Sequence, residues 1–308
     1  MVEEVLAFLR PCPGSRILDG TVGGGGHTAA LLEACLPGGR LLGLDQDVHA
    51  LAVAAERLTA FEGNYVLVQE NFGQALAVMA QLGWEGFDGV LLDLGLSSLQ
   101  LEDGERGFSF LRSGPLDMRM DQRQEICAAD LVNRTSEAEL KQIFRDFGEE
   151  RAAGALARIL VRVRAKTPVT TTTVLVKIIE QIVKRTPRTH LHPATRAFQA
   201  LRIAVNHELD HLAAFLREGY RLLRPAGRMV IIAYHSLEDR LVKEAFRRWS
   251  AACLCPPQLQ VCVCGWSPQV RILTAKPLTP SAQELHLNPR SRSARLRVVE
   301  RYPAEEER

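Results

Sequence analysis

Short apolar runs alternate with stretches of helical periodicity along the first hundred residues. The apolar runs cover residues 16–19, 41–44, 65–68 and 90–94, and the helical stretches between them cover residues 29–36, 48–58 and 74–82. Each run is apolar at nearly every position, which is typical of a strand buried on both faces of a parallel sheet. Strands that alternate with helices predict an α/β fold in which helices cover both faces of the sheet.

A glycine-rich turn follows the first apolar run. The turn reads GTVGGGGH from Gly20, and Asp45 ends the second run, 19 positions after Gly26. This spacing places a carboxylate at the tip of the second strand, where it can accept hydrogen bonds from ribose hydroxyls. The glycines match neither G-x-G-x-x-G nor a Walker loop, and Asp19 would repel a pyrophosphate but could orient an ammonium group. S-adenosylmethionine therefore fits the turn, with a purely structural glycine turn as the alternative.

The composition is that of an ordinary globular chain, but its charge is unevenly distributed. The 308 residues include 38 Lys and Arg against 36 Asp and Glu and are 46% hydrophobic, which excludes a disordered chain, a collagen-like fibre and a disulfide scaffold. Residues 1–105 contain 15 acids and 4 bases, whereas residues 106–308 contain 21 acids and 34 bases. Residues 158–202 alone hold ten bases and one acid, Glu180. A basic segment favours a polyanionic partner, and solvated helix faces are the alternative.

From its apolar stretches and its first residues, we expect neither a membrane span nor a secretory signal. Every long apolar stretch is interrupted before the roughly 20 residues that cross a bilayer. The first ten residues include Glu3 and Glu4 and lack the basic region of a secretory signal. We therefore expect no membrane association and a cytoplasmic location.

Two patterns in the second half concern metal ions. Cys253-x-Cys255 and Cys262-x-Cys264 are C-x-C pairs separated by six residues, and they could supply four thiolates to a structural zinc ion. Disulfides are not expected in a reducing cytoplasm. The segment from His207 to His211 has the letters of the zinc-protease pattern HExxH, but no third ligand follows at a useful spacing. We interpret that segment as part of an amphipathic helix.

Longer motifs spread over the whole chain resemble a known family. Residues 87–100 read FDGVLLDLGLSSLQ, residues 105–110 read ERGFSF and residues 114–120 read GPLDMRM. Further motifs are DGTVGGGGHT from Asp19, LDQD from Leu44, FGEER from Phe147, HPATRAFQALRIAVNHEL from His192, HSLEDR from His235 and NPRSRSARLRV from Asn288. Together they resemble the RsmH (MraW) family of ribosomal RNA methyltransferases, which modify the exocyclic N4 of one cytidine in the decoding region of small-subunit (16S) ribosomal RNA.

The resemblance implies a class I S-adenosylmethionine-dependent methyltransferase with a Rossmann-like parallel sheet and a mainly helical domain inserted after the fourth strand. We place the methyltransferase domain at residues 1–112 and 195–308 and the inserted substrate-recognition domain at residues 113–194. Residues 151–166 and 173–185 have helical periodicity, which agrees with a helical insertion.

The resemblance also assigns cofactor contacts position by position. An aromatic ring at Phe72 could stack on adenine, and Asp93 ends the fourth strand at the edge where ligands of open α/β sheets bind. The implied contacts are Gly25, Gly26, His27, Asp45, Phe72, Asp93 and Gln100.

Methylation of cytosine N4 requires a hydrogen-bond acceptor near the amine. The lone pair of N4 is delocalised into the ring, and an acceptor that holds the amine hydrogens can localise it during attack. Asp93 is the first candidate, and His235 and Glu238 are second choices, although Glu238 and Asp239 could instead favour the amino end of the following helix. The family resemblance has a departure here, because Tyr234 stands where the family usually has Phe. The Asp-Pro-Pro-Tyr motif of amino-group methyltransferases is missing, which leaves the acceptor open.

A cytidine in folded RNA must be splayed out, which calls for phosphate contacts and a stacking platform. Arg196 and Arg202, with Phe198 between them, could provide both, as could Arg290, Arg292, Arg295 and Arg297. The alternate spacing of the last two equally suits one face of a strand. The expected partner is small-subunit ribosomal RNA or the assembled small ribosomal subunit, with the oligomeric state, a homodimer included, left open. The alternatives are a methyltransferase for another nucleic acid or a small amine, and a non-catalytic RNA-binding factor of ribosome assembly.

Overall fold

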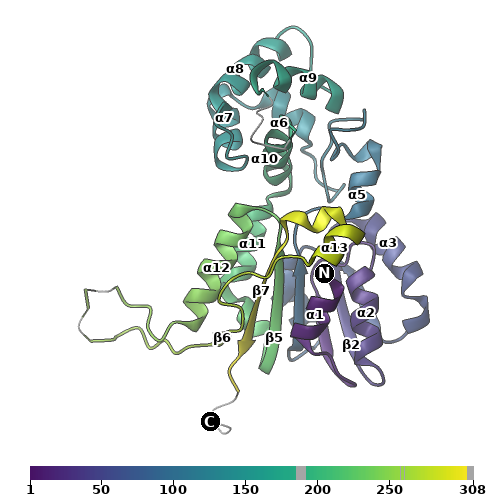
Figure 1. Ribbon diagram of the computed structural model, residues 1–308, viewed down its shortest axis with the longest axis vertical. Helices are drawn as coiled ribbons and strands as arrows, with labels where there is room; N and C mark the ends of the chain where they lie inside the picture. The colour runs from purple at the N-terminus through teal and green to yellow at the C-terminus, as the bar shows by residue number, and fades with distance from the viewer. Residues whose placement is uncertain (185–191, 257, 260, 304–308) are drawn as a thin grey trace. The chain divides into compact units, whose positions relative to one another are not determined.

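The computed structural model describes residues 1–184, 192–256, 258–259 and 261–303, which form two compact units. The sheet unit consists of residues 1–95 and the described residues from 209 onward, and the helical unit consists of the described residues between 96 and 208 (Figure 1). The compact units divide at residues 95 and 208, whereas the sequence analysis placed the borders at 112 and 194. The difference arises because Phe108, Phe198 and Leu201, which lie outside the predicted insertion of residues 113–194, are buried in the core of the helical unit.

The sheet unit contains a sheet of seven strands in the order β3-β2-β1-β4-β5-β7-β6. The strands are β1 (Arg16–Asp19), β2 (Arg40–Asp45), β3 (Tyr65–Gln69), β4 (Phe87–Asp93), β5 (Leu223–Ala233), β6 (Val270–Ile272) and β7 (Arg295–Arg301). The predicted parallel pairing of the first four strands is confirmed, and β5 extends it. The sheet as a whole is mixed, because β7 returns between β5 and β6 and is antiparallel to both.

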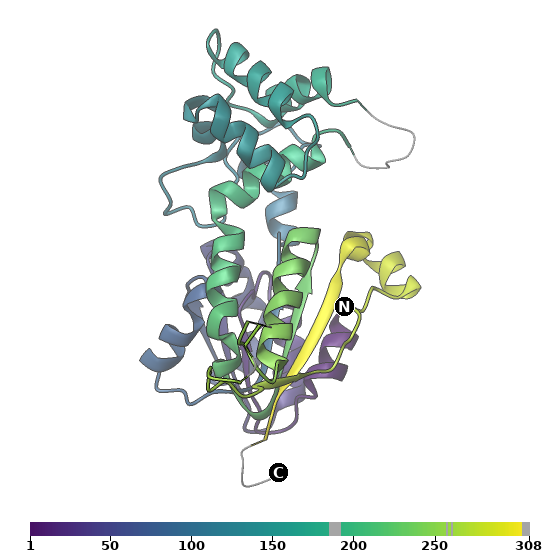
Figure 2. The same cartoon turned by 90° about the vertical axis from the view of Figure 1, so that its left-hand side faces the viewer.

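Helices cover both faces of this sheet (Figures 1 and 2). They are α1 (Val2–Leu9), α2 (Gly26–Cys35), α3 (Val48–Arg57), α4 (Ala75–Gln81), α11 (Glu208–Glu218) and α12 (Ser236–Ser250). The unit also contains α13 (Ala282–Leu287), which has no buried residue, and the short 3-10 turns η1 (Thr59–Phe61), η2 (Phe72–Gln74), η4 (Gly219–Leu222) and η5 (Pro289–Ser293). Leu92 of β4 packs in one core with Phe215 of α11, whereas its neighbour Leu91 packs in another with Leu31 of α2. Burial on both faces explains the continuously apolar runs in the sequence.

The helical unit has its own hydrophobic core. It contains α5 (Ser98–Glu102), η3 (Gly104–Arg106), α6 (Ala128–Arg134), α7 (Glu137–Asp146), α8 (Ala153–Arg164), α9 (Thr172–Ile182) and α10 (Thr195–Asn206). The helices predicted at 151–166 and 173–185 are α8 and α9, and residue 185 lies outside the described residues. Buried Asn206 joins α10 to an irregular segment, since its Nδ2 donates to Met118 O at 2.8 Å and its Oδ1 accepts from Met120 N at 2.7 Å. In the described part of the chain, no helix combines the length and the apolar character that crossing a membrane requires.

Candidate functional site

A buried carboxylate holds the glycine-rich turn between β1 and α2. Asp19 is fully buried at the end of β1. Its Oδ1 accepts from Thr21 N at 3.1 Å, and its Oδ2 accepts from the Thr28 hydroxyl at 2.7 Å. Burial raises the pKa of Asp19, and the hydrogen bond from Thr28 acts in the opposite direction. Both carboxylate oxygens therefore fix the conformation of the turn, a role that the sequence analysis did not assign to Asp19.

The turn packs closely against α3 and leaves an unpartnered polar atom at the start of α2. Gly25, the residue before α2, has a φ of +76°, and a Cβ there would lie 3.2 Å from Cα of Ala54. Gly26 is the first residue of α2, and His27 follows it. His27 Nδ1 lies 3.5 Å from Asp93 Oδ2, while its Nε2 is buried without a hydrogen-bond partner among the described residues. Because buried polar atoms are normally paired, this nitrogen marks a place where a polar ligand group can bind.

Asp45 lies beside the same turn, at the end of β2. Its Oδ2 accepts from Gly23 N at 2.8 Å, and its Oδ1 accepts from Asp47 N at 2.9 Å. Burial raises the pKa of Asp45 to about 6, although the N–H groups of Asp47 and Gly23 act against that rise. A carboxylate offers about four lone-pair sites, so Asp45 can still accept hydrogen bonds from two further donors.

Asp93 ends β4 and joins the turn to β5. Its backbone N donates to Thr21 Oγ1 at 2.6 Å, and its Oδ1 accepts from the Tyr234 hydroxyl at 2.9 Å. Burial raises the pKa of Tyr234, and the charge of Asp93 adds to the rise, so the phenol stays protonated and donates. The Asp93 side chain is 24% exposed, so the carboxylate is oriented by protein groups and still accessible. In the sequence, Tyr234 stands out only as a departure from the family pattern, and its contact with Asp93 was not predicted.

His235 and Glu238 form the amino-terminal cap of α12. His235 Nδ1 accepts from Glu238 N at 3.4 Å. Glu238 Oε2 accepts from the backbone N of Tyr234 at 2.8 Å and of His235 at 3.2 Å. Both side chains are almost fully buried. Their contacts fit the structural alternative given above for Glu238, and they hold the backbone of Tyr234 beside Asp93.

The other two predicted cofactor contacts lie in different units. Phe72 follows β3 in the sheet unit and is half-buried, and its ring packs edge-on to Phe215 with 5.9 Å between the centroids. Gln100 lies in the helical unit, where its Oε1 accepts from Ser97 N at 3.1 Å and its backbone N donates to Ser97 Oγ at 3.2 Å. Gln100 thus has a local capping role at the start of α5.

The arginines predicted to bind RNA differ in their surroundings. Arg202 binds both carboxylate oxygens of Glu208, at 2.8 and 2.9 Å, and is 14% exposed. Arg196 is half-buried and donates to the backbone O of Glu149 at 3.2 Å. Arg202 is therefore engaged in an ion pair within its own unit, which weakens its prediction as a phosphate ligand.

The arginines near the carboxyl terminus separate into two pairs. Arg290 and Arg292 lie on η5 and are exposed. Arg295 and Arg297 start β7, and both bind the Asp239 carboxylate, at 3.1 Å and 2.6 Å. The strand interpretation of the alternate spacing is confirmed for Arg295 and Arg297, whereas Arg290 and Arg292 stay candidates for RNA binding.

The two metal-like patterns have different outcomes. Helix α10 ends at Asn206, His207 has a left-handed φ of 50°, and α11 begins at Glu208. The two histidines of the HExxH segment therefore do not lie on one continuous helix, as that motif requires. The four cysteines lie in the loop after α12, with their Sγ atoms all within 4.8 Å of one another.

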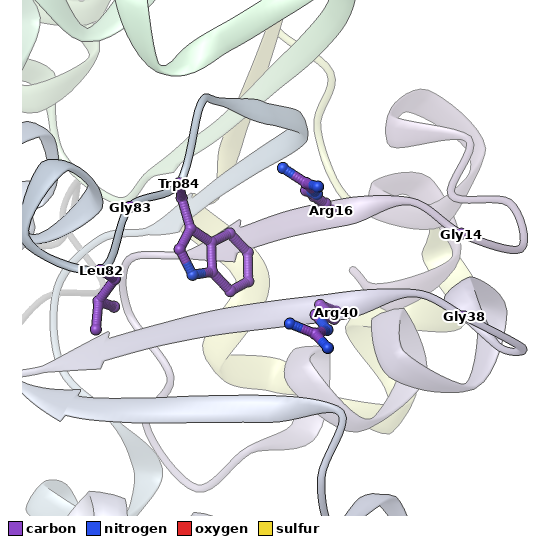
Figure 3. Close-up of a pocket in the computed structure, with 7 residues that line it drawn as sticks. All are labelled: Gly14, Arg16, Gly38, Arg40, Leu82, Gly83 and Trp84. Carbon is purple, nitrogen blue, oxygen red and sulfur yellow. The ribbon is translucent and has the colours of Figure 1, made fainter.

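A cavity of about 300 Å³ lies at the opposite edge of the sheet (Figure 3). Its lining residues are Gly14, Arg16, Gly38, Arg40, Leu82, Gly83 and Trp84. Arg16 and Arg40 are the first residues of β1 and β2, so this cavity lies at the amino edge, whereas Asp19 and Asp45 end the same strands. No carboxylate is among these lining residues. The carboxylate that can accept hydrogen bonds from a ribose, Asp45, lies at the carboxyl edge instead.

The parallel strands, the glycine-rich turn after β1 and the carboxylates that end β1, β2 and β4 define a Rossmann-like α/β protein of the class I methyltransferase type. A family model described as the MraW methylase family matches residues 1–302. The chain belongs to this family, which confirms the resemblance seen in its motifs.

Curated relatives cover nearly the whole chain. The protein named ribosomal RNA small subunit methyltransferase H from Pelobacter propionicus is 52% identical over 303 residues, which cover 98% of this chain and 97% of the relative. The protein of the same name from Geotalea daltonii is 51% identical, covering 97% of this chain and 96% of its own length. That from Symbiobacterium thermophilum is 47% identical, covering 100% and 97%.

Proposed function

We propose that this protein transfers a methyl group from S-adenosylmethionine to the exocyclic N4 of a cytidine in the decoding region of small-subunit ribosomal RNA. Membership of a methylase family and the names of the relatives support methyl transfer and the type of RNA. The observation that carries the proposal is Asp93, an accessible carboxylate that the Tyr234 hydroxyl orients at the strand ends of a methylase fold.

The residues around the glycine-rich turn fit S-adenosylmethionine. A Cβ at Gly26 would meet only the Arg57 guanidinium within 4 Å, so the backbone there is open to a ligand, and Asp45 can accept hydrogen bonds from ribose hydroxyls. His27 Nε2 has no hydrogen-bond partner in the described structure and could contact a polar group of the ligand. The surplus of acids in residues 1–105 favours a cationic ligand. When bound, the cofactor would supply an electrophilic methyl group on its sulfonium sulfur.

We assign the role of hydrogen-bond acceptor for the amine to Asp93. A carboxylate that holds an amine hydrogen increases the lone-pair density on nitrogen and can take the proton released after methylation. Tyr234 acts as a positioning residue, because its hydroxyl fixes Oδ1 of Asp93. His235 and Glu238 act one step further away, because their capping contacts hold the backbone of Tyr234.

We further propose that the helical unit recognises the RNA. Arg162, Lys166 and Lys177 are exposed on or beside α8 and α9, and no acid other than Glu180 lies in the basic segment. Exposed bases of this kind bind phosphates without reading the sequence. The substrate is then a cytidine in ribosomal RNA, either naked or within the assembled small subunit. Which of the two is methylated depends on the form in which the folded RNA exposes the cytidine.

The test uses labelled S-adenosylmethionine with naked small-subunit RNA and with small subunits from a strain that lacks the gene. We expect label in one of these substrates with the wild type and about a hundredfold less with Asp93→Asn, which keeps the side-chain shape and removes the charge. Transfer to a small amine or to another nucleic acid instead would refute the RNA proposal. Tight binding to small subunits without any transfer would favour a non-catalytic assembly factor.

A further inference from the structure

The loop between α12 and β6, residues 251–269, carries four cysteines and extends away from the sheet (Figure 1). The Sγ atom of Cys262 lies 3.3 Å from that of Cys253, 4.0 Å from that of Cys255 and 3.5 Å from that of Cys264. The Sγ atoms of Cys253 and Cys264 are 3.7 Å apart. A tetrahedral zinc ion with Zn–S bonds of about 2.3 Å requires S···S distances of about 3.8 Å. We propose that these four thiolates bind one Zn²⁺ ion as a closed structural site.

Backbone N–H groups already point at the sulfur atoms. Leu254 N donates to Cys264 Sγ at 3.4 Å, Cys255 N donates to Cys253 Sγ at 3.3 Å, and Val263 N donates to Cys255 Sγ at 3.4 Å. Four thiolates around Zn²⁺ carry a net charge of −2, and hydrogen bonds from outside the ligand set stabilise such a charge. The chain therefore supplies both the ligands and the donors that a zinc tetrathiolate uses.

Hydrophobic packing does not account for the convergence of the cysteines. Leu259, Val261 and Val263 in the same loop are 52%, 73% and 76% exposed. The described residues of the loop contain neither a helix nor a strand. A segment with little buried apolar surface needs a staple such as a metal ion or disulfides to hold one conformation.

Two hydrogen bonds hold the base of the loop. Trp266 Nε1 donates to Ala251 O at 3.1 Å, and Gln269 N donates to Trp249 O at 2.8 Å. The four cysteines lie in the sequence between the two ends of this base. A metal ion would therefore fix the part of the loop that these two hydrogen bonds do not reach.

Zinc fits the four sulfurs better than disulfides do. The four S···S distances given above are far longer than the 2.05 Å of a disulfide bond, and Cys262 is near three other cysteines rather than one. Tetrahedral S₄ sites select zinc or iron among common metals, so the metal content of the protein distinguishes the two.

The experiment measures metal content by elemental analysis of the full chain, produced with added zinc and purified under reducing conditions without chelators. We expect about one zinc per chain for the wild type and less than a tenth of that for the double variant Cys253→Ser/Cys262→Ser. The control variant Cys12→Ser/Cys127→Ser removes two cysteines outside the loop and should keep the full zinc content. Iron in place of zinc, no metal in the wild type, or full zinc in the loop variant would each overturn the proposal.

A second measurement covers the case in which the loop variant does not fold. Co²⁺ is titrated into the metal-free wild type, and we expect saturation at one equivalent with the thiolate charge-transfer and ligand-field absorption of a tetrahedral S₄ site. Added Zn²⁺ should remove that absorption. Absence of the thiolate bands would contradict the proposal whatever the state of the variant. Binding of S-adenosylmethionine, measured on the same samples, reports on the proposed function separately.

Discussion

The hydroxyl of Tyr234 provides a direct test of how Asp93 is positioned. Tyr234→Phe removes one oxygen, which donates to Asp93 Oδ1 at 2.9 Å, and leaves the ring in place. A hydrogen bond to a charged group contributes about 1.5–3 kcal/mol. Because Asp93 is 24% exposed, water can replace part of this interaction, and the lower end of the range applies. We therefore expect kcat to fall by about tenfold, with KM for both substrates changed by less than about twofold.

The assay is methyl transfer to small subunits, measured as a double-mutant cycle with Asp93→Asn. If Tyr234 acts through the Asp93 carboxylate, Tyr234→Phe should cause little further loss in the Asp93→Asn background. A tenfold loss in both backgrounds would show that Tyr234 acts independently of Asp93. A rise in KM for S-adenosylmethionine without a loss in kcat would refute the positioning role altogether.

Three further predictions concern cofactor affinity, the turn and the basic surface. Because ribose hydroxyls donate to ionised Asp45, the affinity for S-adenosylmethionine, measured by calorimetry, should be full above the pKa of about 6 and fall about tenfold by pH 5. The variant Asp45→Asn should bind the cofactor weakly and without this pH dependence. Gly25→Ala should lower thermal stability by more than Gly63→Ala, because both glycines have positive φ but only at position 25 would a Cβ meet other atoms. Equal losses of unfolding free energy, about 1–2 kcal/mol in each variant, would leave backbone strain as the sole cause. Arg162→Ala should weaken binding to small subunits and reduce the salt dependence of that binding, whereas Arg202→Ala should chiefly lower the unfolding temperature. The reverse pattern would contradict a phosphate-binding role for Arg162 and a structural role for Arg202.

Local features of the site could be predicted from the sequence. A strand, a glycine-rich turn and a helix follow one another within residues 16–35, so the position of Asp45 and the conformational freedom of Gly25 follow from spacing. The cap of α12 is also local, because His235 and Glu238 are three residues apart. Glu238 stands at the third helical position, as in a capping box, but a search for that box would have missed it because the first residue is His235 rather than Ser or Thr.

Contacts between distant parts of the chain could not be predicted in this way. Tyr234 and Asp93 are 141 residues apart, and Arg297 and Asp239 are 58 residues apart. Their pairing depends on strand order, which periodicity does not reveal. The antiparallel direction of β7 could not be predicted for the same reason. The residue pattern of a strand shows which of its faces are buried but does not show which strand lies beside it.

The chemical position of the transferred methyl group distinguishes cytidine N4 methylation from the alternative reactions. Small-subunit RNA is methylated by the wild-type protein, digested to nucleosides and to short fragments, and analysed by mass spectrometry. We expect N4-methylcytidine at one position, in a fragment from the decoding region, and its loss with Asp93→Asn. A methyl group on another base, on a ring carbon of cytidine or in another region of the RNA would contradict it.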